Sequence, residues 1–182
     1  MKQFVLSKDY GAVLRYIRSR VRTYADYYND GPGDHTDMIR RVTLGFSFEG
    51  NAWAALVFDT RGDQPVDDAW QDHVQENCIL LDHWASIAAH LQEFPAGEED
   101  DAEPSLTLIT HDGEPEEFYE YDPDDLAVVF GDTLWATLVE ARGAGILTRL
   151  PLAQGCLMDV REVDGRFLWP RLEDQQRRGT VV

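Results

Sequence analysis

The sequence predicts a single α+β domain, residues 1–182, in which an antiparallel sheet built from hairpins packs against about three helices. Three observations predict this class. Apolar residues recur at helical spacing in three segments, and in shorter segments they alternate at strand spacing. Successive strands are joined by turns and do not alternate with helices as in βαβ units. A chain of 182 residues with 43% hydrophobic residues is also large enough to bury one core.

The first predicted helix runs from about Lys8 to Asn29. Val13, Ile17 and Val21 recur every four residues and form one apolar face. The glycines and the proline of the following sequence, NDGPGDHTD, predict that the helix ends in a loop. The face opposite the apolar one carries three basic residues: Arg15, Arg18 and Arg22.

A hairpin is predicted after this loop. Val42, Leu44 and Phe46 lie at alternate positions, as they do in a strand with one buried face. The sequence EGN supplies a turn, and Trp53–Phe58 is the returning strand.

The longest helical candidate runs from Asp67 to Phe94. Asp67 and Asp68 at its beginning suit the positive end of a helix dipole. Its apolar stripe keeps helical spacing through Trp70, Val74, Cys78, Leu81, Ala85, Ala88 and Leu91.

An acidic loop is expected at about residues 95–104, followed by a strand, SLTLIT, and a partner strand, EEFYEY, across the turn HDGEPE. Asp122 can cap a third helix, Pro123 fits its first position, and Asp124 and Asp125 favour its positive end. The sequence GAG ends that helix. The dipeptide Asp164-Gly165 then joins the two strands of a last hairpin, and a frayed polar tail ends the chain.

The tryptophans are divided between core and surface. Trp169, before Pro170, lies at a strand end and is expected to be exposed, as an anchor for a partner would be. The other four fall on predicted apolar stripes or strands and are expected in the core: Trp53, Trp70, Trp84 and Trp135.

No pattern of residues predicts catalysis, a metal or a cofactor. The sequence contains no G-x-S-x-G and no phosphate-binding loop. His83 and His90 are seven residues apart, about 10 Å along a helix, which is too far to share one metal. The histidines are therefore expected at the surface or an interface. Two cysteines, Cys78 and Cys156, favour a reducing compartment, and no apolar segment is long enough to span a membrane, so a cytoplasmic protein is expected.

Charge is strongly segregated along the chain. The net charge is −18, and the residues between Gly62 and Ala141 include 22 of the 34 acids but no lysine or arginine. Such a surface argues against binding nucleic acid or anionic membranes and favours a basic protein partner. The sequence does not distinguish a monomer from an oligomer.

The segment from Glu93 to Asp125 concentrates this charge, with fourteen acids and four aromatic rings. Charge runs are often only solvated surface, but aromatic rings between carboxylates are typical of an interface with a charged rim. The residues expected to contact a partner are Glu99, Asp100, Asp101, Glu116, Glu117, Tyr119, Tyr121, Asp124 and Asp125.

In overall character the chain resembles the acidic immunity proteins of bacterial polymorphic-toxin and contact-delivered effector systems. The resemblance lies in the hairpin GFSFEGNAWAALVFDTRGD, the tryptophan-bearing helix expected after it, and the acidic aromatic segment. It implies a non-enzymatic inhibitor that blocks a basic toxin domain. Two alternatives stay open: a DNA mimic or other acidic interaction protein that acts on a host enzyme, and a small-molecule enzyme with Cys78 and His83 as its candidate residues.

Overall fold

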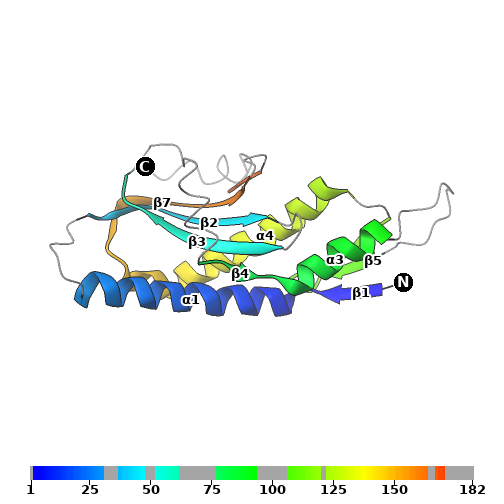
Figure 1. The fold of residues 1–182 in the computed structure, drawn as a ribbon, viewed down its shortest axis with the longest axis horizontal. Coiled ribbons are helices and arrows are strands. Elements are labelled where there is room, and N and C mark those ends of the chain that lie inside the picture. The colour runs from blue at the N-terminus through cyan, green and yellow to red at the C-terminus, as the bar shows by residue number, and fades with distance from the viewer. Residues whose placement is uncertain are drawn as a thin grey trace.

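The computed structural model describes most of the chain as three α-helices, one 3-10 helix and two sheets (Figure 1). The helices are α1 (Ser7–Asp30), α3 (Asp82–Glu93), α4 (Pro123–Gly143) and η1 (Ile146–Arg149). The described residues are 2–30, 37–47, 52–61, 77–93, 106–119, 122–163 and 167–170.

The eight described strands form a three-stranded and a five-stranded sheet. The smaller sheet has the order β1-β5-β6, from Lys2–Val5, Leu106–Ile109 and Pro115–Phe118. The larger sheet has the order β4-β3-β2-β7-β8, from Ile79–Leu80, Trp53–Asp59, Ile39–Ser47, Leu152–Glu162 and Leu168–Trp169.

The predicted α+β class is confirmed, and so are its hairpins. Strands β2 and β3, β5 and β6, and β7 and β8 pair in antiparallel fashion. The sheets are nevertheless mixed, because β1 pairs with β5 and β2 pairs with β7 in parallel. Each parallel pair joins segments about a hundred residues apart, and a hairpin pattern holds no information about such a pairing.

One continuous core joins both sheets to the helices. Val42, Leu44 and Phe46 alternate along β2 and are fully buried, as their spacing predicts. Helices α1 and α4 pack against each other and lie along one face of the five-stranded sheet (Figure 1). Val13 and Ile17 from the apolar face of α1 belong to the same core cluster.

The long helix predicted from Asp67 to Phe94 is wrong at residues 77–81, whereas α3 confirms its last part. Ile79 and Leu80 form strand β4, which pairs with β3, and α3 begins only at Asp82. The Leu81 amide donates a 2.8 Å hydrogen bond to the carbonyl of Ala52 and ends this pairing. Apolar residues at helical spacing do not exclude a short strand, and here the free edge of β3 decides the backbone conformation. Residues 62–76 lie outside the described part of the chain.

Trp169 is buried and is not the exposed anchor that its position at a strand end predicted. Its side chain is 1% exposed and packs directly against helix α4 at Gly131. Its Nε1 donates a 2.6 Å hydrogen bond to Asp132 at the edge of the core. A tryptophan with its indole N–H paired in this way can be buried without an unsatisfied donor.

The remaining tryptophans differ in burial. Trp84 is fully buried, as predicted, and stacks on Phe130 of α4 with ring centroids 3.9 Å apart. Trp53 and Trp135 are half-buried against the core clusters, and Trp70 lies outside the described residues. The stack of Trp84 on Phe130 ties α3 to α4, and the rings of His83 and His90 on α3 lie near Phe4 of the smaller sheet.

Candidate functional site

The structure describes the acidic segment at Glu93, at residues 106–119 and from Asp122 onward. We call β5, β6 and the turn between them, residues 106–119, the acidic hairpin. Leu106, Leu108 and Phe118 point into the core, while Glu116 and Glu117 of β6 are exposed. Among the described strands β6 lies at the edge of its sheet, so these carboxylates lie where another chain can approach.

The turn of the acidic hairpin is held by its own side chains. The Thr110 amide donates to the Glu114 carbonyl at 2.9 Å, and Gly113 adopts a φ of +94°, a region that favours glycine. The Thr110 hydroxyl lies within hydrogen-bond reach of both the Asp112 carboxylate and the Glu114 carbonyl. The bond from Thr110 lowers the pKa of Asp112. Asp112 therefore keeps its negative charge at a fixed position.

A pocket of about 330 Å³ lies between the acidic hairpin and α4. Four carboxylates line it, and none of its lining residues is a lysine or an arginine. We call it the acidic pocket. Its lining residues are Thr110, His111, Asp112, Glu114, Pro115, Glu116, Val129, Asp132 and Thr133.

Helix α4 supplies the wall of the acidic pocket opposite the acidic hairpin. The Asp132 carboxylate accepts the Trp169 indole hydrogen bond, so a buried ring of β8 orients it. Val129 and Asp132 lie three residues apart on one helical stripe, and Asp125 lies one turn before Val129 on that stripe. The stripe extends the acidic surface from the pocket to the beginning of the helix.

The beginning of α4 has the cap that the sequence predicts. The Asp122 carboxylate accepts from the Asp124 amide at 2.8 Å and the Asp125 amide at 3.4 Å, with Pro123 at the first position. Asp124 and Asp125 are exposed and also complement the helix dipole. Their charge therefore has a role in helix stability in addition to any contact with a partner.

Tyr119 follows the acidic hairpin and is 45% exposed. Its hydroxyl donates a 2.9 Å hydrogen bond to Glu117, and this bond raises the pKa of Tyr119. An exposed aromatic ring beside a carboxylate is the combination that the sequence predicts for an interface.

The predicted contact residues are only partly within the described chain. Glu116 and Glu117 lie on β6, Tyr119 follows it, and Asp124 and Asp125 are in the first turn of α4. Three further acids, Asp112, Glu114 and Asp132, also line the acidic pocket, and the sequence patterns did not select them. Asp132 could have been found, because it lies two helical turns after Asp125 on the same face of α4. Outside the described residues are Glu99, Asp100, Asp101 and Tyr121.

A tyrosine of α1 packs against the turn of the acidic hairpin. The Tyr10 ring stacks on His111 with centroids 5.4 Å apart, and the Tyr10 hydroxyl donates to the Glu140 carboxylate of α4. Burial and the Glu140 carboxylate together raise the pKa of Tyr10 to about 12. Tyr10 thus connects the acidic hairpin with both long helices.

Replacing Glu140 with glutamine is expected to lower the pKa of Tyr10 towards the ordinary tyrosine value of about 10. The folded pKa lies above the unfolded one, so the stabilisation from this hydrogen bond is complete below about pH 10. It is lost as the pH rises through about 12. The titration of the Tyr10 ring, followed by carbon NMR in the parent and the Glu140→Gln variant, measures the shift. An unchanged pKa would show that burial alone raises it.

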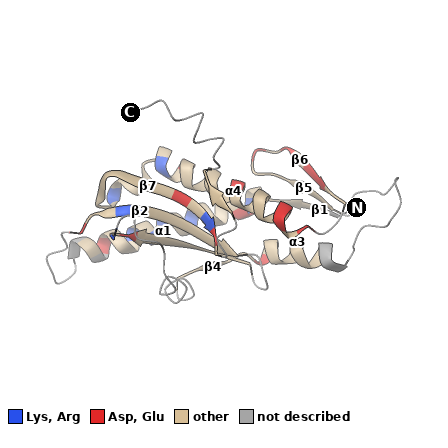
Figure 2. Ribbon diagram, turned by 90° about the horizontal axis from the view of Figure 1, so that it is seen from above, with Lys and Arg blue, Asp and Glu red and all other residues tan. Residues whose placement is uncertain are grey.

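Charge is also segregated in space (Figure 2). The acidic hairpin and the first turns of α4 carry red residues and no blue ones, because residues 106–119 and 122–141 contain no lysine or arginine. Arginines of α1 gather instead near the end of α4 and η1, as the lining of a second pocket shows. Among the described residues, the acidic hairpin and the first turns of α4 therefore carry formal charges of one sign, which would attract a basic molecule.

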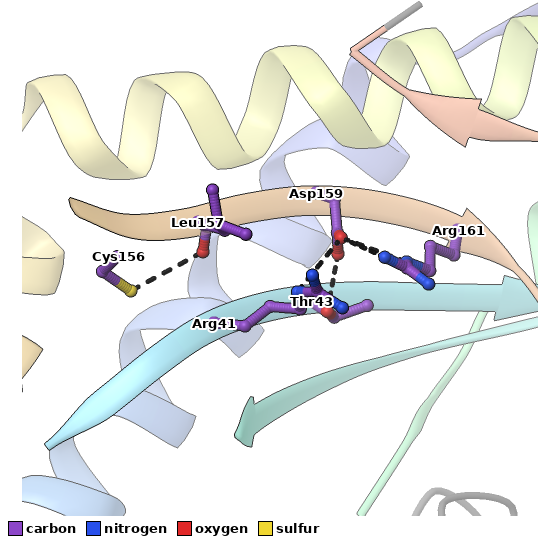
Figure 3. Close-up of polar contacts among 6 residues, drawn as sticks. All are labelled: Arg41, Thr43, Cys156, Leu157, Asp159 and Arg161. Carbon is purple, nitrogen blue, oxygen red and sulfur yellow. Dashed lines mark hydrogen bonds and ion pairs between the residues drawn. The ribbon is translucent and has the colours of Figure 1, made fainter. Parts of the chain in front are cut away.

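A polar cluster on the five-stranded sheet has a structural explanation (Figure 3). The Asp159 carboxylate of β7 is 7% exposed and accepts from the Thr43 hydroxyl at 2.6 Å and from Arg161 Nη2 at 2.7 Å. Arg41 of β2 lies 3.7 Å away. A buried carboxylate needs such partners, and these join β2 to β7.

The cysteines and the histidine considered for an enzyme lie in different surroundings. Cys156 donates to the neighbouring Leu157 carbonyl at 3.6 Å (Figure 3), and burial raises the pKa of its thiol. Cys78 packs in the cluster around Ala55. His83 Nδ1 instead lies 2.5 Å from the buried Asp9 carboxylate, whose pKa burial raises while His83 lowers it. This pair joins α1 to α3.

Comparisons of the chain with protein-family models, with curated proteins and with solved structures found no match. Among the described residues, no helix is long and apolar enough to cross a membrane. The same residues contain no group of three or more histidine, cysteine or acidic side chains arranged to hold a metal ion.

Proposed function

We propose that the chain is a cytoplasmic, non-enzymatic binding protein that blocks a basic protein partner through the acidic pocket. The partner that fits best is the catalytic domain of an antibacterial toxin, as for the immunity proteins that the sequence resembles. One observation carries this proposal. Asp112, Glu114, Glu116 and Asp132 line one pocket, and none of its lining residues is a lysine or an arginine.

The dimensions of the acidic pocket suit a side chain of the partner. A volume of about 330 Å³ is at the small end of ligand pockets and admits one arginine or lysine side chain. A guanidinium placed there meets carboxylates from both the acidic hairpin and α4, and bidentate pairs of this kind are stronger than neutral hydrogen bonds. Val129 supplies an apolar surface for the methylene part of such a side chain.

Charges on an edge strand also have a simpler use. Carboxylates on β6 discourage the edge-to-edge pairing of sheets between molecules. Protection against edge-to-edge pairing explains the exposed acids on β6. It does not require Asp132, which lies on α4 and is oriented by the buried Trp169. Protection of the β6 edge therefore does not explain why Asp132 lines the acidic pocket, although its carboxylate also serves as the acceptor for the buried Trp169 indole.

The association rate with the partner is expected to fall steeply as salt rises. At physiological ionic strength the Debye length is about 8 Å, so added salt screens long-range attraction between exposed charges. Stopped-flow mixing with a basic partner domain, identified first by a search of the neighbouring genes for a toxin, measures the effect from low to high salt. An association rate that does not change with salt would contradict steering by the acidic hairpin.

A protection assay tests the biological role directly. If a toxin gene lies beside the gene for this chain, expression of its toxin domain in bacteria is expected to stop growth, and co-expression of this chain is expected to restore it. The two proteins should then co-purify as a complex. A neighbourhood of metabolic genes with no toxin, or a toxin that the chain neither binds nor neutralises, would contradict the proposal.

A further inference from the structure

A second pocket, of about 480 Å³, lies between α1 and the short helix η1. Four arginines line it in a protein whose net charge is −18. We call it the arginine pocket. It shares no lining residue with the acidic pocket. Its lining residues are Arg15, Arg18, Ser19, Val21, Arg22, Gly145, Ile146 and Arg149.

The arginines come together for a geometric reason. Arg15, Arg18 and Arg22 are separated by three and four residues, so they lie along one stripe of α1. The chain turns at Gly145, whose φ of +71° lies in the region that glycine favours, and η1 then brings Arg149 to the same stripe. A threonine hydroxyl, from Thr148, donates to the Gly145 carbonyl at 2.7 Å and holds this turn.

The positive charge of the arginine pocket is only partly balanced. Asp26 lies 3.8 Å from both Arg22 Nε and Arg149 Nη2, and each of these contacts is long and exposed. Within the described part of the chain, no carboxylate forms an ion pair with Arg15 or Arg18. Among the described residues, Asp26 is therefore the one carboxylate in an ion pair with these four arginines, and it contacts only Arg22 and Arg149.

The floor of the pocket is apolar. Val21 is 1% exposed and belongs to the core, and Ile146 is half-buried against it. The Ser19 side chain adds a hydroxyl group at the wall. Arginine forks match the geometry of phosphate oxygens, and an apolar floor beneath them matches an organic group attached to that phosphate.

We propose that the arginine pocket binds a small phosphorylated organic molecule, with its phosphate held by Arg15, Arg18 and Arg149. The organic part of the ligand lies on Val21 and Ile146. A nucleic acid does not fit this site, because a long polyanion would extend beyond the four arginines into the field of a strongly acidic protein. A small molecule fits within about one Debye length, roughly 8 Å, of the cluster.

Calorimetric titration with phenyl phosphate tests the proposal, with inorganic phosphate and benzoate as comparison probes at physiological salt. Phenyl phosphate is expected to bind one to one and more tightly than either probe, because only it carries both a phosphate and an apolar ring. The Arg18→Gln variant is expected to bind it about tenfold more weakly or worse, since a hydrogen bond to a charged group is lost.

The matched control is Arg40→Gln, which removes the same charge from an exposed position outside this pocket. It is expected to leave the affinity for phenyl phosphate unchanged, and both variants should unfold at the parent temperature. Equal weakening in the two variants would overturn the proposal, because net charge alone would then explain binding. Benzoate binding as tightly as phenyl phosphate would overturn the phosphate specificity. Absence of saturable binding, with an oligomer that Arg18→Gln dissociates, would instead make this pocket a contact between copies of the chain.

Discussion

The triple variant Glu114→Lys/Glu116→Lys/Glu117→Lys is expected to fold like the parent and to bind its basic partner at least about a hundredfold more weakly. Each reversal replaces an attraction by a repulsion, and close charge pairs in interfaces are typically worth about 1.5 kcal/mol or more. All three side chains are exposed, so their replacement should change the free energy of unfolding by only about 0.5 kcal/mol each. Circular dichroism and urea unfolding check the fold, and calorimetry checks the affinity.

Single reversals separate local contact from net charge. Glu116→Lys and Asp37→Lys change the charge equally and at exposed positions, but only Glu116 lines the acidic pocket. Glu116→Lys is expected to weaken binding and Asp37→Lys to leave the dissociation rate unchanged. If the triple variant binds as tightly as the parent, the acidic hairpin is only a charged edge that prevents aggregation, and the proposed function fails with it. Binding of phenyl phosphate to the arginine pocket would be unaffected by that result.

Local patterns were sufficient to predict the elements that are defined by short-range physics. The stripe of Val13, Ile17 and Val21 predicts α1, and the sequence Asp122-Pro123 predicts where α4 begins and how it is capped. Both predictions depend on contacts within a few residues, which a sequence contains directly. The β5–β6 hairpin was predicted for the same reason.

Predictions failed where distant segments decide the structure. Ile79 and Leu80 form a strand because they pair with the edge of β3. The spacing of the apolar residues around them gives no information about that pairing. Trp169 is buried because Gly131 leaves room for its ring, and these two residues are 38 positions apart in the sequence. Both errors concern pairings between segments that only the folded chain brings together.

The sequence likewise predicted the local part of the candidate site and missed the part that depends on contacts between distant segments. The run of acids in the sequence identified the acidic hairpin and the first turn of α4, because charge density is a local property. It did not identify the pocket, which requires Asp132 to face the acidic hairpin across a gap that only the packing of α4 creates. The arginine pocket has the same origin: a basic stripe was visible on α1, while Arg149 joins it through the turn at Gly145.

Replacing Gly131 with alanine is expected to destabilise the protein by about 2–4 kcal/mol, although alanine favours a helix by about 1 kcal/mol over glycine. A Cβ at this position would lie 2.0 Å from Trp169 Cη2 and 2.1 Å from Cζ2, so the whole indole must move. Overpacking of a core costs about 1–3 kcal/mol, and complete loss of a buried tryptophan costs about 3–5 kcal/mol. A displaced indole also loses its hydrogen bond to Asp132. Urea unfolding of the variant and the parent measures the resulting change in the free energy of unfolding.

Two further variants make this prediction specific to the contact between Gly131 and Trp169. Gly143→Ala places a methyl group on the same helix where no atom lies within 4 Å, so it should leave stability unchanged or raise it by up to about 1 kcal/mol. In a Trp169→Ala background the obstacle to a Cβ is gone, and Gly131→Ala should then become neutral or stabilising. This reversal of sign is the coupling that a double-mutant cycle measures between residues in contact. If Gly131→Ala destabilises equally in both backgrounds, the tryptophan does not pack on this glycine, and the orientation of Asp132 in the acidic pocket loses its structural basis.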